Sequence, residues 1–194
     1  MITASEYIRK LIHLFNLVIP LFYVFIITDK DTLLIFLAIF TGLFIFIDIT
    51  RMRLKIVEKL FARLFNAMLR SHELDGKFTG ATWVMMGAWL TILIFPKNVA
   101  VLSLLFVSFG DIAAALIGMQ FGKHKIWGKS WEGFSGGLAV CLFVAWLFPL
   151  VPLKIGFAGA LTAMIVEIAP IPLDDNFKMP LAAGGIMMMM TSFL

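Results

Sequence analysis

The sequence predicts an all-α protein, a polytopic membrane helix bundle of about seven transmembrane helices whose N-terminus is cytoplasmic. Composition gives the first reason: 61% of the 194 residues are hydrophobic and only 14% are charged, whereas soluble domains carry about 25% charged residues. The mean hydropathy of +1.00 is the second reason. The third is that apolar runs close to the ~20 residues needed to span a bilayer recur along the whole chain. An ordinary soluble domain is therefore excluded.

Seven apolar runs define the predicted helices. In chain order they cover residues 11–27, 32–49, 79–95, 99–121, 134–151, 155–169 and 179–194, the last two being the shortest. The first run follows Arg9 and Lys10, but no small-residue cleavage site follows it, so we interpret it as a retained helix and not as a signal peptide. We find no internal repeat, linker or soluble domain, and we expect residues 1–194 to form a single integral membrane domain.

A basic amphipathic helix is predicted between the second and third runs, over about residues 51–70. Apolar residues recur there at helical spacing, while Lys55, Lys59 and Arg63 follow one another at intervals of four on another face. This pattern is typical of a helix that lies in the membrane interface. Anchoring to anionic lipid head groups explains it, and guiding a lipid substrate to the site is the functional alternative.

The positive charges are distributed unevenly between the two predicted faces. If the N-terminus is cytoplasmic, thirteen of the 16 lysine and arginine residues lie inside, and Lys30, Lys97 and Lys154 lie outside. Cytoplasmic loops carry such an excess of positive charge. The net charge of +4 therefore follows from topology and does not indicate a nucleic-acid partner. The single cysteine, Cys141, excludes an internal disulfide.

Polar residues collect on the predicted inner face, most densely between Ser108 and Gly133. Asp111 lies inside the fourth apolar run, where a charged residue costs about 2.5–3.5 kcal/mol on insertion scales, so we expect it to be functional. Further inner-face candidates share this location but not a defined role. They are Lys10, His13, Glu73 and Asp174.

Carboxylates, lysines and glycines on one membrane face indicate a polyphosphate held by Mg²⁺. Mg²⁺ prefers oxygen ligands and is usually bound by one or two carboxylates together with substrate phosphates; Asp111 and Asp175 suit this role. Lys123, Lys125 and Lys129 could neutralise phosphates, and Gly128 and Gly133 would let backbone N–H groups approach them. Helix packing is the alternative explanation for the glycines. The spacing from Gly122 to Ser130 is one residue too long for a P-loop.

Five motifs are spread over the chain from end to end. They are Glu6-x-x-Arg-Lys-x-x-His13, Gly80-Ala-Thr82, Gly110-Asp111-x-Ala-Ala-x-x-Ile-Gly118-x-x-x-Gly122, Gly128-Lys-Ser-x-Glu-Gly133 and Asp174-Asp-Asn-Phe-x-x-Pro180. In this order they resemble the CTP-dependent lipid kinases, which include phytol kinase, dolichol kinase and yeast-type diacylglycerol kinase. These kinases are related in turn to phosphatidate cytidylyltransferases.

The resemblance implies transfer of the terminal phosphoryl group of a nucleoside triphosphate, usually CTP, to the hydroxyl of a membrane lipid, with Mg²⁺. The implied acceptor is phytol, a polyprenol or dolichol, or diacylglycerol. The predicted catalytic residues are Asp111, Lys129, Glu132 and Glu167. The predicted nucleotide-binding residues are Gly110, Lys123, Gly128, Ser130, Gly133 and Asn176. Asp111 and Asp175 are the predicted metal ligands, and the general base is open among Glu167, Glu73 and His13.

Two alternatives compete with the lipid kinase. A phosphatidate cytidylyltransferase would use the same residues to join CMP to a lipid phosphate and release pyrophosphate. An ion-coupled transporter could use Asp48, Asp111 and Glu167 as an intramembrane relay. A transporter predicts polar residues through both leaflets, whereas the predicted outer half of this chain is almost bare of them. The sequence therefore favours an enzyme with its active site on the cytoplasmic side.

Overall fold

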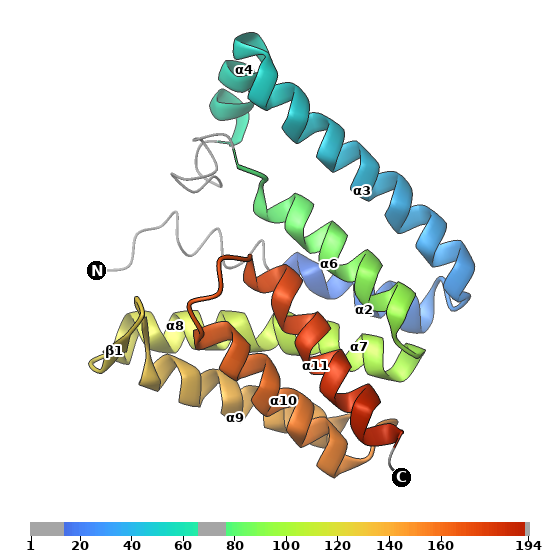
Figure 1. Ribbon diagram of the computed structural model, residues 1–194, viewed down its shortest axis with the longest axis vertical. Coiled ribbons are helices and arrows are strands. Elements are labelled where there is room, and N and C mark those ends of the chain that lie inside the picture. Colours follow the sequence, from blue (N-terminus) through green and yellow to red (C-terminus); the bar gives the residue numbers. More distant parts are fainter. Residues whose placement is uncertain (1–13, 66–76, 193–194) are drawn as a thin grey trace.

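A computed structural model of the protein describes residues 14–65 and 77–192, and its regular structure there is helical apart from one short hairpin (Figure 1). The elements in chain order are η1 (Phe15–Leu17), α2 (Val18–Phe25), α3 (Lys30–Arg53), α4 (Lys55–Phe65), α6 (Gly80–Ile94), α7 (Lys97–Phe106), the π-helix η2 (Val107–Asp111), α8 (Ile112–Phe121), β1 (Lys125–Ile126), β2 (Lys129–Ser130), α9 (Trp131–Leu147), α10 (Leu153–Ile168) and α11 (Asp175–Thr191). The all-α prediction is confirmed for this part of the chain.

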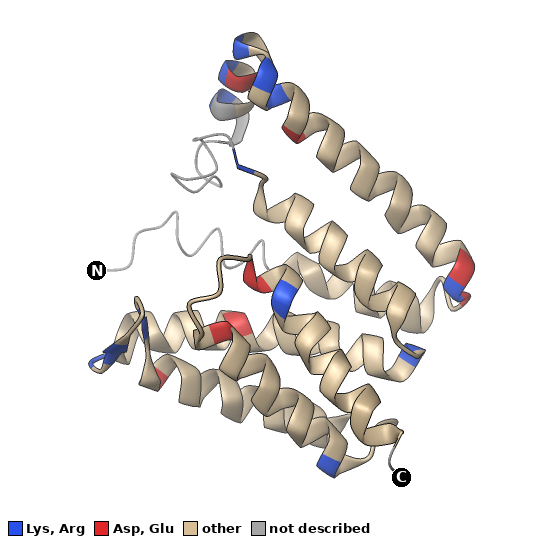
Figure 2. Ribbon diagram, in the orientation of Figure 1, with Lys and Arg blue, Asp and Glu red and all other residues tan. Residues whose placement is uncertain are grey.

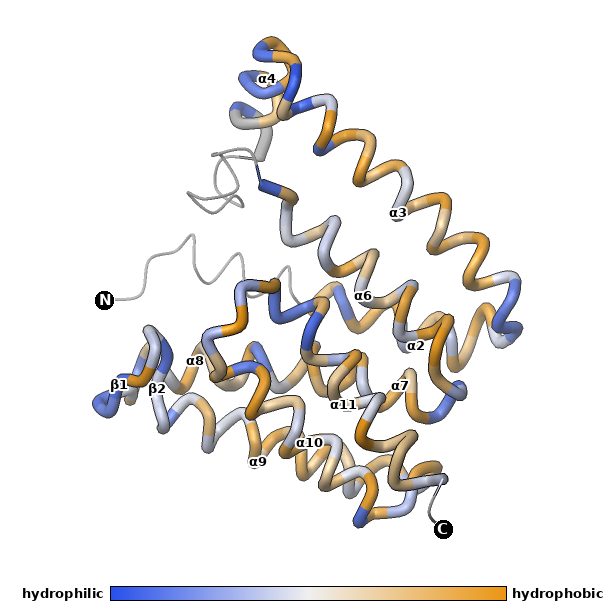
Figure 3. Tube along the Cα trace, in the orientation of Figure 1, coloured by the Kyte–Doolittle hydropathy of each residue, from blue (hydrophilic) through white to orange (hydrophobic). Residues whose placement is uncertain are grey.

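Each of the seven predicted apolar runs falls on a helix. Two helices of the described part are long and apolar enough to cross a membrane: α3, with 24 residues, and the continuous 25-residue helix Lys97–Phe121 formed by α7, η2 and α8. The first has 22% of its most apolar stretch buried inside the protein and the second 61%. Figure 3 shows apolar residues along the helices and hydrophilic residues at their ends and in the hairpin.

Polar side chains fix where several helices begin. Asp29 accepts a hydrogen bond from the amide of Thr32 at the start of α3, and Thr79 accepts one from Thr82 at the start of α6. Ser130 and Asp174 play the same part for α9 and α11. A capping side chain satisfies one of the amides that a helix leaves unpaired at its N-terminus. The caps of α9 and α11 matter most, because the candidate site lies beside both of them.

Part of the buried core lies among α7, α9, α10 and α11, where Phe106, Met164 and Met179 are fully buried. Small residues let neighbouring helices approach closely. At Gly87 of α6, a Cβ atom would lie 2.3 Å from the main-chain oxygen of Asn176 on α11. This contact fixes the N-terminal turn of α11 against α6. α3 lies at the edge of the bundle and packs against α6 (Figure 1).

A buried polar network ties α3 to the start of α6. Asp48 Oδ2 accepts hydrogen bonds from Thr79 N at 2.8 Å and from Thr82 Oγ1 at 2.6 Å, and Asp48 Oδ1 pairs with Arg51 at 3.0 Å. A buried charge is tolerated when it is paired and hydrogen-bonded in this way. Asp48 therefore takes part in a structural network, apart from the Asp111 and Glu167 cluster described below.

The predicted amphipathic helix over residues 51–70 is divided differently in the structure. α3 continues to Arg53, the chain turns at Leu54, and α4 begins at Lys55. The ring of Phe61 on α4 lies 5.2 Å from the guanidinium carbon of Arg51, which joins α4 to the buried network. Residues 66–70 lie outside the described part.

The loop between α8 and α9 contains a hairpin whose two strands have two residues each. The sequence predicted no strand there. Lys125 pairs with Ser130 and Ile126 pairs with Lys129. Trp127 and Gly128 form the turn with φ angles of 48° and 85°, a conformation that glycine adopts at no steric cost. The hairpin brings Lys129 back toward the helix bundle.

Candidate active site

Three carboxylates from distant parts of the sequence meet where the end of α10 and the start of α11 lie beside the middle of the continuous helix Lys97–Phe121. Asp111 is the last residue of η2, Glu167 lies one residue before the end of α10, and Asp175 is the first residue of α11. One oxygen of each lies within 4.8 Å of the others, and Asp111 and Glu167 are buried. Figure 2 shows acidic residues close together in this region. We refer to Asp111, Glu167 and Asp175 as the carboxylate cluster.

Lys129 reaches this cluster from the hairpin. Its Nζ lies 2.8 Å from Glu167 Oε1 and 3.0 Å from Asp175 Oδ2, and it also donates to the main-chain oxygen of Glu167. Burial lowers the pKa of the Lys129 ammonium, but the carboxylates of Asp175 and Glu167 outweigh burial and hold that pKa above its ordinary value. Lys129 therefore stays charged at physiological pH. One third of its side chain is exposed, at 33%.

A second ammonium group, that of Lys178, lies on the other side of Asp175. Its Nζ is 3.0 Å from Asp175 Oδ1, and only 8% of its side chain is exposed. It also donates to the main-chain oxygens of Ala169 and Ile171 at 3.4 and 3.5 Å. Sequence reasoning assigned Lys178 only to the inner membrane face. The sequence did contain one indication of this contact: Lys178 follows Asp175 by three residues, which puts both on one helix face.

The cluster suits a divalent cation such as Mg²⁺. Its ligands are hard carboxylate oxygens, as Mg²⁺ prefers. With all five groups ionised, the three carboxylates and the two ammonium groups leave one net negative charge. Asp175 Oδ1 is buried and makes no hydrogen bond to any described residue, so its contact with Lys178 is ionic only. A buried oxygen without a hydrogen bond is costly, and a bound cation would compensate it.

Two predicted nucleotide-binding residues lie at helix starts beside the cluster. Ser130 caps α9, where its Oγ accepts a hydrogen bond from Gly133 N at 3.1 Å. Asn176 is buried and its Nδ2 donates to Asp174 Oδ1, the cap of α11, at 2.7 Å. Asn176 Oδ1 accepts a hydrogen bond from Asn16 Nδ2 at 3.2 Å. Sequence reasoning missed Asn16. The one feature that could have indicated a role for it is that its side chain is a polar amide within the first apolar run.

Other predicted site residues lie elsewhere in the structure. Glu132 pairs with His124 Nδ1 at 2.7 Å and accepts from His124 N, so it closes the base of the hairpin. Lys123 is exposed. The remaining candidates, Lys10, His13 and Glu73, lie outside the described residues.

The predicted nucleotide-binding glycines have local structural roles. A Cβ at Gly110 would lie 2.5 Å from Cys141 Sγ, and one at Gly133 would lie 2.6 Å from the main-chain oxygen of Ala114. Both contacts are between helices, which favours the packing explanation. Gly128 is open on all sides and supplies the positive φ of the hairpin turn. Nucleotide binding by these residues stays a prediction.

Comparison with known proteins finds relatives over most of the chain. An uncharacterised protein of Rickettsia prowazekii (strain Madrid E) is 30% identical over 184 residues, which are 90% of this chain and 89% of that protein. CTP-dependent diacylglycerol kinase 1 of Schizosaccharomyces pombe is 29% identical over 175 residues, 78% of this chain and 76% of the kinase. No protein-family model and no solved structure matches.

CTP-dependent diacylglycerol kinase 1 of Saccharomyces cerevisiae is 30% identical over 155 residues, 76% of this chain. The match spans about half, 51%, of that kinase. The two kinases agree with the family that the five motifs resemble, and the matches are too extensive to depend on one motif. The chain therefore belongs to the family of CTP-dependent lipid kinases.

Proposed function

We propose that this protein transfers the γ-phosphoryl group of CTP to the free hydroxyl of a diacylglycerol in the membrane. The carboxylate cluster carries the proposal: it joins three acidic groups and two ammonium groups among apolar helices, in a chain similar to two diacylglycerol kinases. Phosphoryl transfer needs alignment and charge stabilisation more than covalent help from the protein. The cluster supplies groups for both.

Asp111 and Asp175 would hold Mg²⁺, with Glu167 beside them; when it is bound, Mg²⁺ neutralises phosphate charge. Lys129 orients Glu167 and Asp175 through its two ion pairs. Its partly exposed ammonium group can also contact a phosphate. Lys178 holds Asp175 from the opposite side. Glu167 is the one candidate for the general base among the described residues, because His13 and Glu73 lie outside them.

We infer further that the chain crosses the membrane about seven times and that the carboxylate cluster faces the cytoplasm. The hairpin, the end of α10 and the start of α11 lie toward the same side of the bundle (Figure 1), and Glu167 and Asp175 of the cluster belong to the last two. At the opposite ends of the helices, Lys30 donates to the main-chain oxygen of Leu93 and Lys97 donates to that of Thr28. These lysines belong to the smaller, outer group of positive charges.

Cysteine labelling in intact cells tests this topology. Lys125→Cys on the exposed hairpin should resist a membrane-impermeant thiol reagent, while Lys154→Cys at the start of α10 should react. The native Cys141 is buried, so we expect the reagent not to label it. Labelling of position 125 together with protection of position 154 would reverse the proposed orientation.

Labelled CTP separates the kinase from a cytidylyltransferase. In a kinase the lipid hydroxyl attacks the γ-phosphorus and CDP leaves, whereas a cytidylyltransferase joins a lipid phosphate to the α-phosphorus and releases pyrophosphate. We expect purified protein with diacylglycerol to incorporate label from γ-labelled CTP and none from α-labelled CTP. Lipid labelled from the α position, with release of pyrophosphate, would contradict the kinase assignment.

A further inference from the structure

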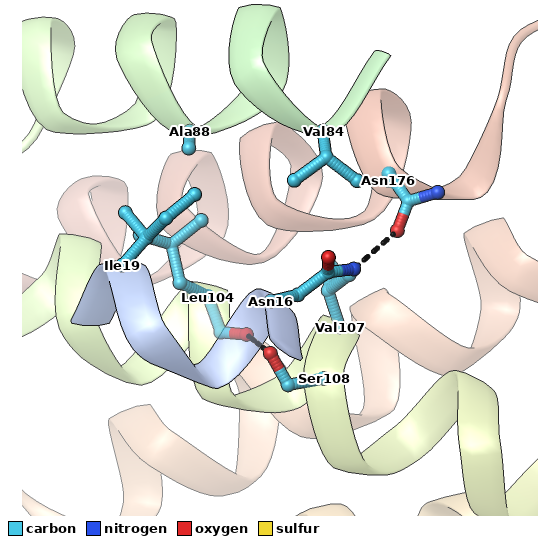
Figure 4. Close-up of a pocket in the computed structure, with 8 residues that line it drawn as sticks. All are labelled: Asn16, Ile19, Val84, Ala88, Leu104, Val107, Ser108 and Asn176. Atoms are coloured by element: carbon cyan, nitrogen blue, oxygen red, sulfur yellow. Dashed lines mark hydrogen bonds between the residues drawn. The ribbon is translucent and has the colours of Figure 1, made fainter. Parts of the chain in front are cut away.

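A pocket lies between η1, α2, α6, α7, η2 and the start of α11 (Figure 4). Its empty volume, open solvent included, is about 230 Å³. Asn16, Asn176 and Ser108 give it polar groups, and Ile19, Ala88 and Leu104 give it apolar walls. In Figure 4 the two asparagines lie at one end of the group and Ile19 and Ala88 at the other. This space suits a small polar group attached to a hydrocarbon.

The polar end has hydrogen-bonding capacity left over. Asn16 Nδ2 donates to Asn176 Oδ1 at 3.2 Å, but within the described part of the chain Asn16 Oδ1 accepts no hydrogen bond. Ser108 Oγ donates to the main-chain oxygen of Leu104 at 2.9 Å, which leaves the lone pairs of that hydroxyl available. A hydroxyl group can donate to the first oxygen and accept from a second donor.

The same residues connect this pocket to the carboxylate cluster. Asn176 follows Asp175 on α11, and Ser108 lies three residues before Asp111 in η2. The backbone of Asn176 is held by close contact with Gly87, so the floor of the pocket and the start of α11 share one fixed segment. A hydroxyl in this pocket would therefore contact the two segments, η2 and the start of α11, that also carry Asp111 and Asp175.

We propose that this pocket binds the hydroxyl end of the lipid acceptor and that Asn16 is a positioning residue for that hydroxyl. The inference rests on the proposed lipid kinase function. The acceptor oxygen forms the new bond to the γ-phosphorus, the bond from that phosphorus to the bridging oxygen breaks and CDP leaves. The hydroxyl proton passes to a carboxylate of the cluster, for which Glu167 is the candidate.

The outer surface of η1 and α2 offers a path for the hydrocarbon chains. Phe15 is 69% exposed, and Val18 and Phe22 are 42% and 41% exposed on the same short segment. In a membrane these side chains face lipid tails. An acceptor whose hydroxyl lies near Asn16 would thus keep its chains in the bilayer, beside the helix that supplies the asparagine.

Kinetics of an Asn16→Ala variant test the proposed role of Asn16. The KM for diacylglycerol should rise about tenfold, the effect of losing one well-placed hydrogen bond, while the KM for CTP should stay within about twofold. Asn98→Ala makes the same exchange at the exposed start of α7 and should change neither constant. If Asn16→Ala still transfers γ-label and its KM for diacylglycerol is unchanged, the assignment of this pocket to the lipid hydroxyl is wrong. The kinase assignment would remain intact.

Cross-linking of the wild-type protein gives a second readout that needs no variant. A diacylglycerol analogue with a diazirine close to its glycerol should label peptides containing residues 15–19 and 104–108, in competition with unmodified diacylglycerol. Labelling confined to other segments would overturn the pocket assignment. Failure of the protein to transfer γ-label to any lipid alcohol would instead overturn the proposed function and this inference with it.

Discussion

Replacing Asp111 by asparagine should lower kcat by about 10²–10³-fold, the loss typical when a preorganised electrostatic group is removed. The exchange keeps the size of the side chain and removes one of the three negative charges of the carboxylate cluster. Asp111 is 7% exposed, so solvent cannot replace the lost ligand easily. The measurement is γ-label transfer from CTP to diacylglycerol by purified protein at saturating substrate.

Asp31→Asn is the matched control for this variant. Asp31 is exposed in the first turn of α3, at the opposite end of the bundle, and should tolerate the exchange with unchanged kcat. Both variants should insert and purify in normal yield. Activity of Asp111→Asn close to that of the wild type would show that Asp111 is a packing residue and not a metal ligand.

Replacing Lys129 by methionine should cost about 10²-fold in kcat/KM for CTP, in line with the loss of an electrostatic contact in the site. Methionine keeps much of the length and the apolar stem, and it removes the charge that holds Glu167 and Asp175 at 2.8 and 3.0 Å. The two carboxylates would then repel each other and move apart. Steady-state kinetics over a range of CTP concentrations should show a raised KM together with a lowered kcat.

Lys154→Met provides the comparison for Lys129→Met, because Lys154 is exposed at the start of α10, away from the cluster. Its kinetics should match the wild type. Wild-type kinetics of Lys129→Met would remove Lys129 from the site. A variant that loses kcat with no change in the KM for CTP would limit Lys129 to orienting the carboxylates.

Much of the fold could be predicted because membrane helices are encoded by local composition. The predicted runs 79–95 and 99–121 correspond to α6 and to the continuous helix Lys97–Phe121. The hairpin could not be predicted, since its strands have two residues each and no alternating pattern. Its turn also places Trp127 where asparagine or aspartate is usual.

The candidate site was predictable where charge stands out against an apolar background. Asp111 was proposed as functional because it lies in an apolar run, and Glu167 was one of three candidates for the general base. The structure brings both together with Lys129 and Asp175. Lys178 was missed because positive-inside topology already explained it. Its role depends on a contact within the first turn of α11, which composition does not reveal.

The glycines show a different limit of sequence reasoning. A missing Cβ can face a bound phosphate, a neighbouring helix or nothing, and the sequence alone is the same in all three cases. Gly133 faces the main chain of α8, whereas Gly128 faces open space in a turn. Only the three-dimensional structure distinguishes a packing glycine such as Gly133 from a turn glycine such as Gly128.

Electron paramagnetic resonance of Mn²⁺, used in place of Mg²⁺, tests the central claim that Asp111, Glu167 and Asp175 form the metal and nucleotide site. The wild-type protein should bind Mn²⁺ more tightly when CTP is present. Asp111→Asn and Asp175→Asn should each abolish this CTP-dependent binding, and Asp31→Asn should retain it. CTP-dependent Mn²⁺ binding that survives in both cluster variants would contradict the assignment.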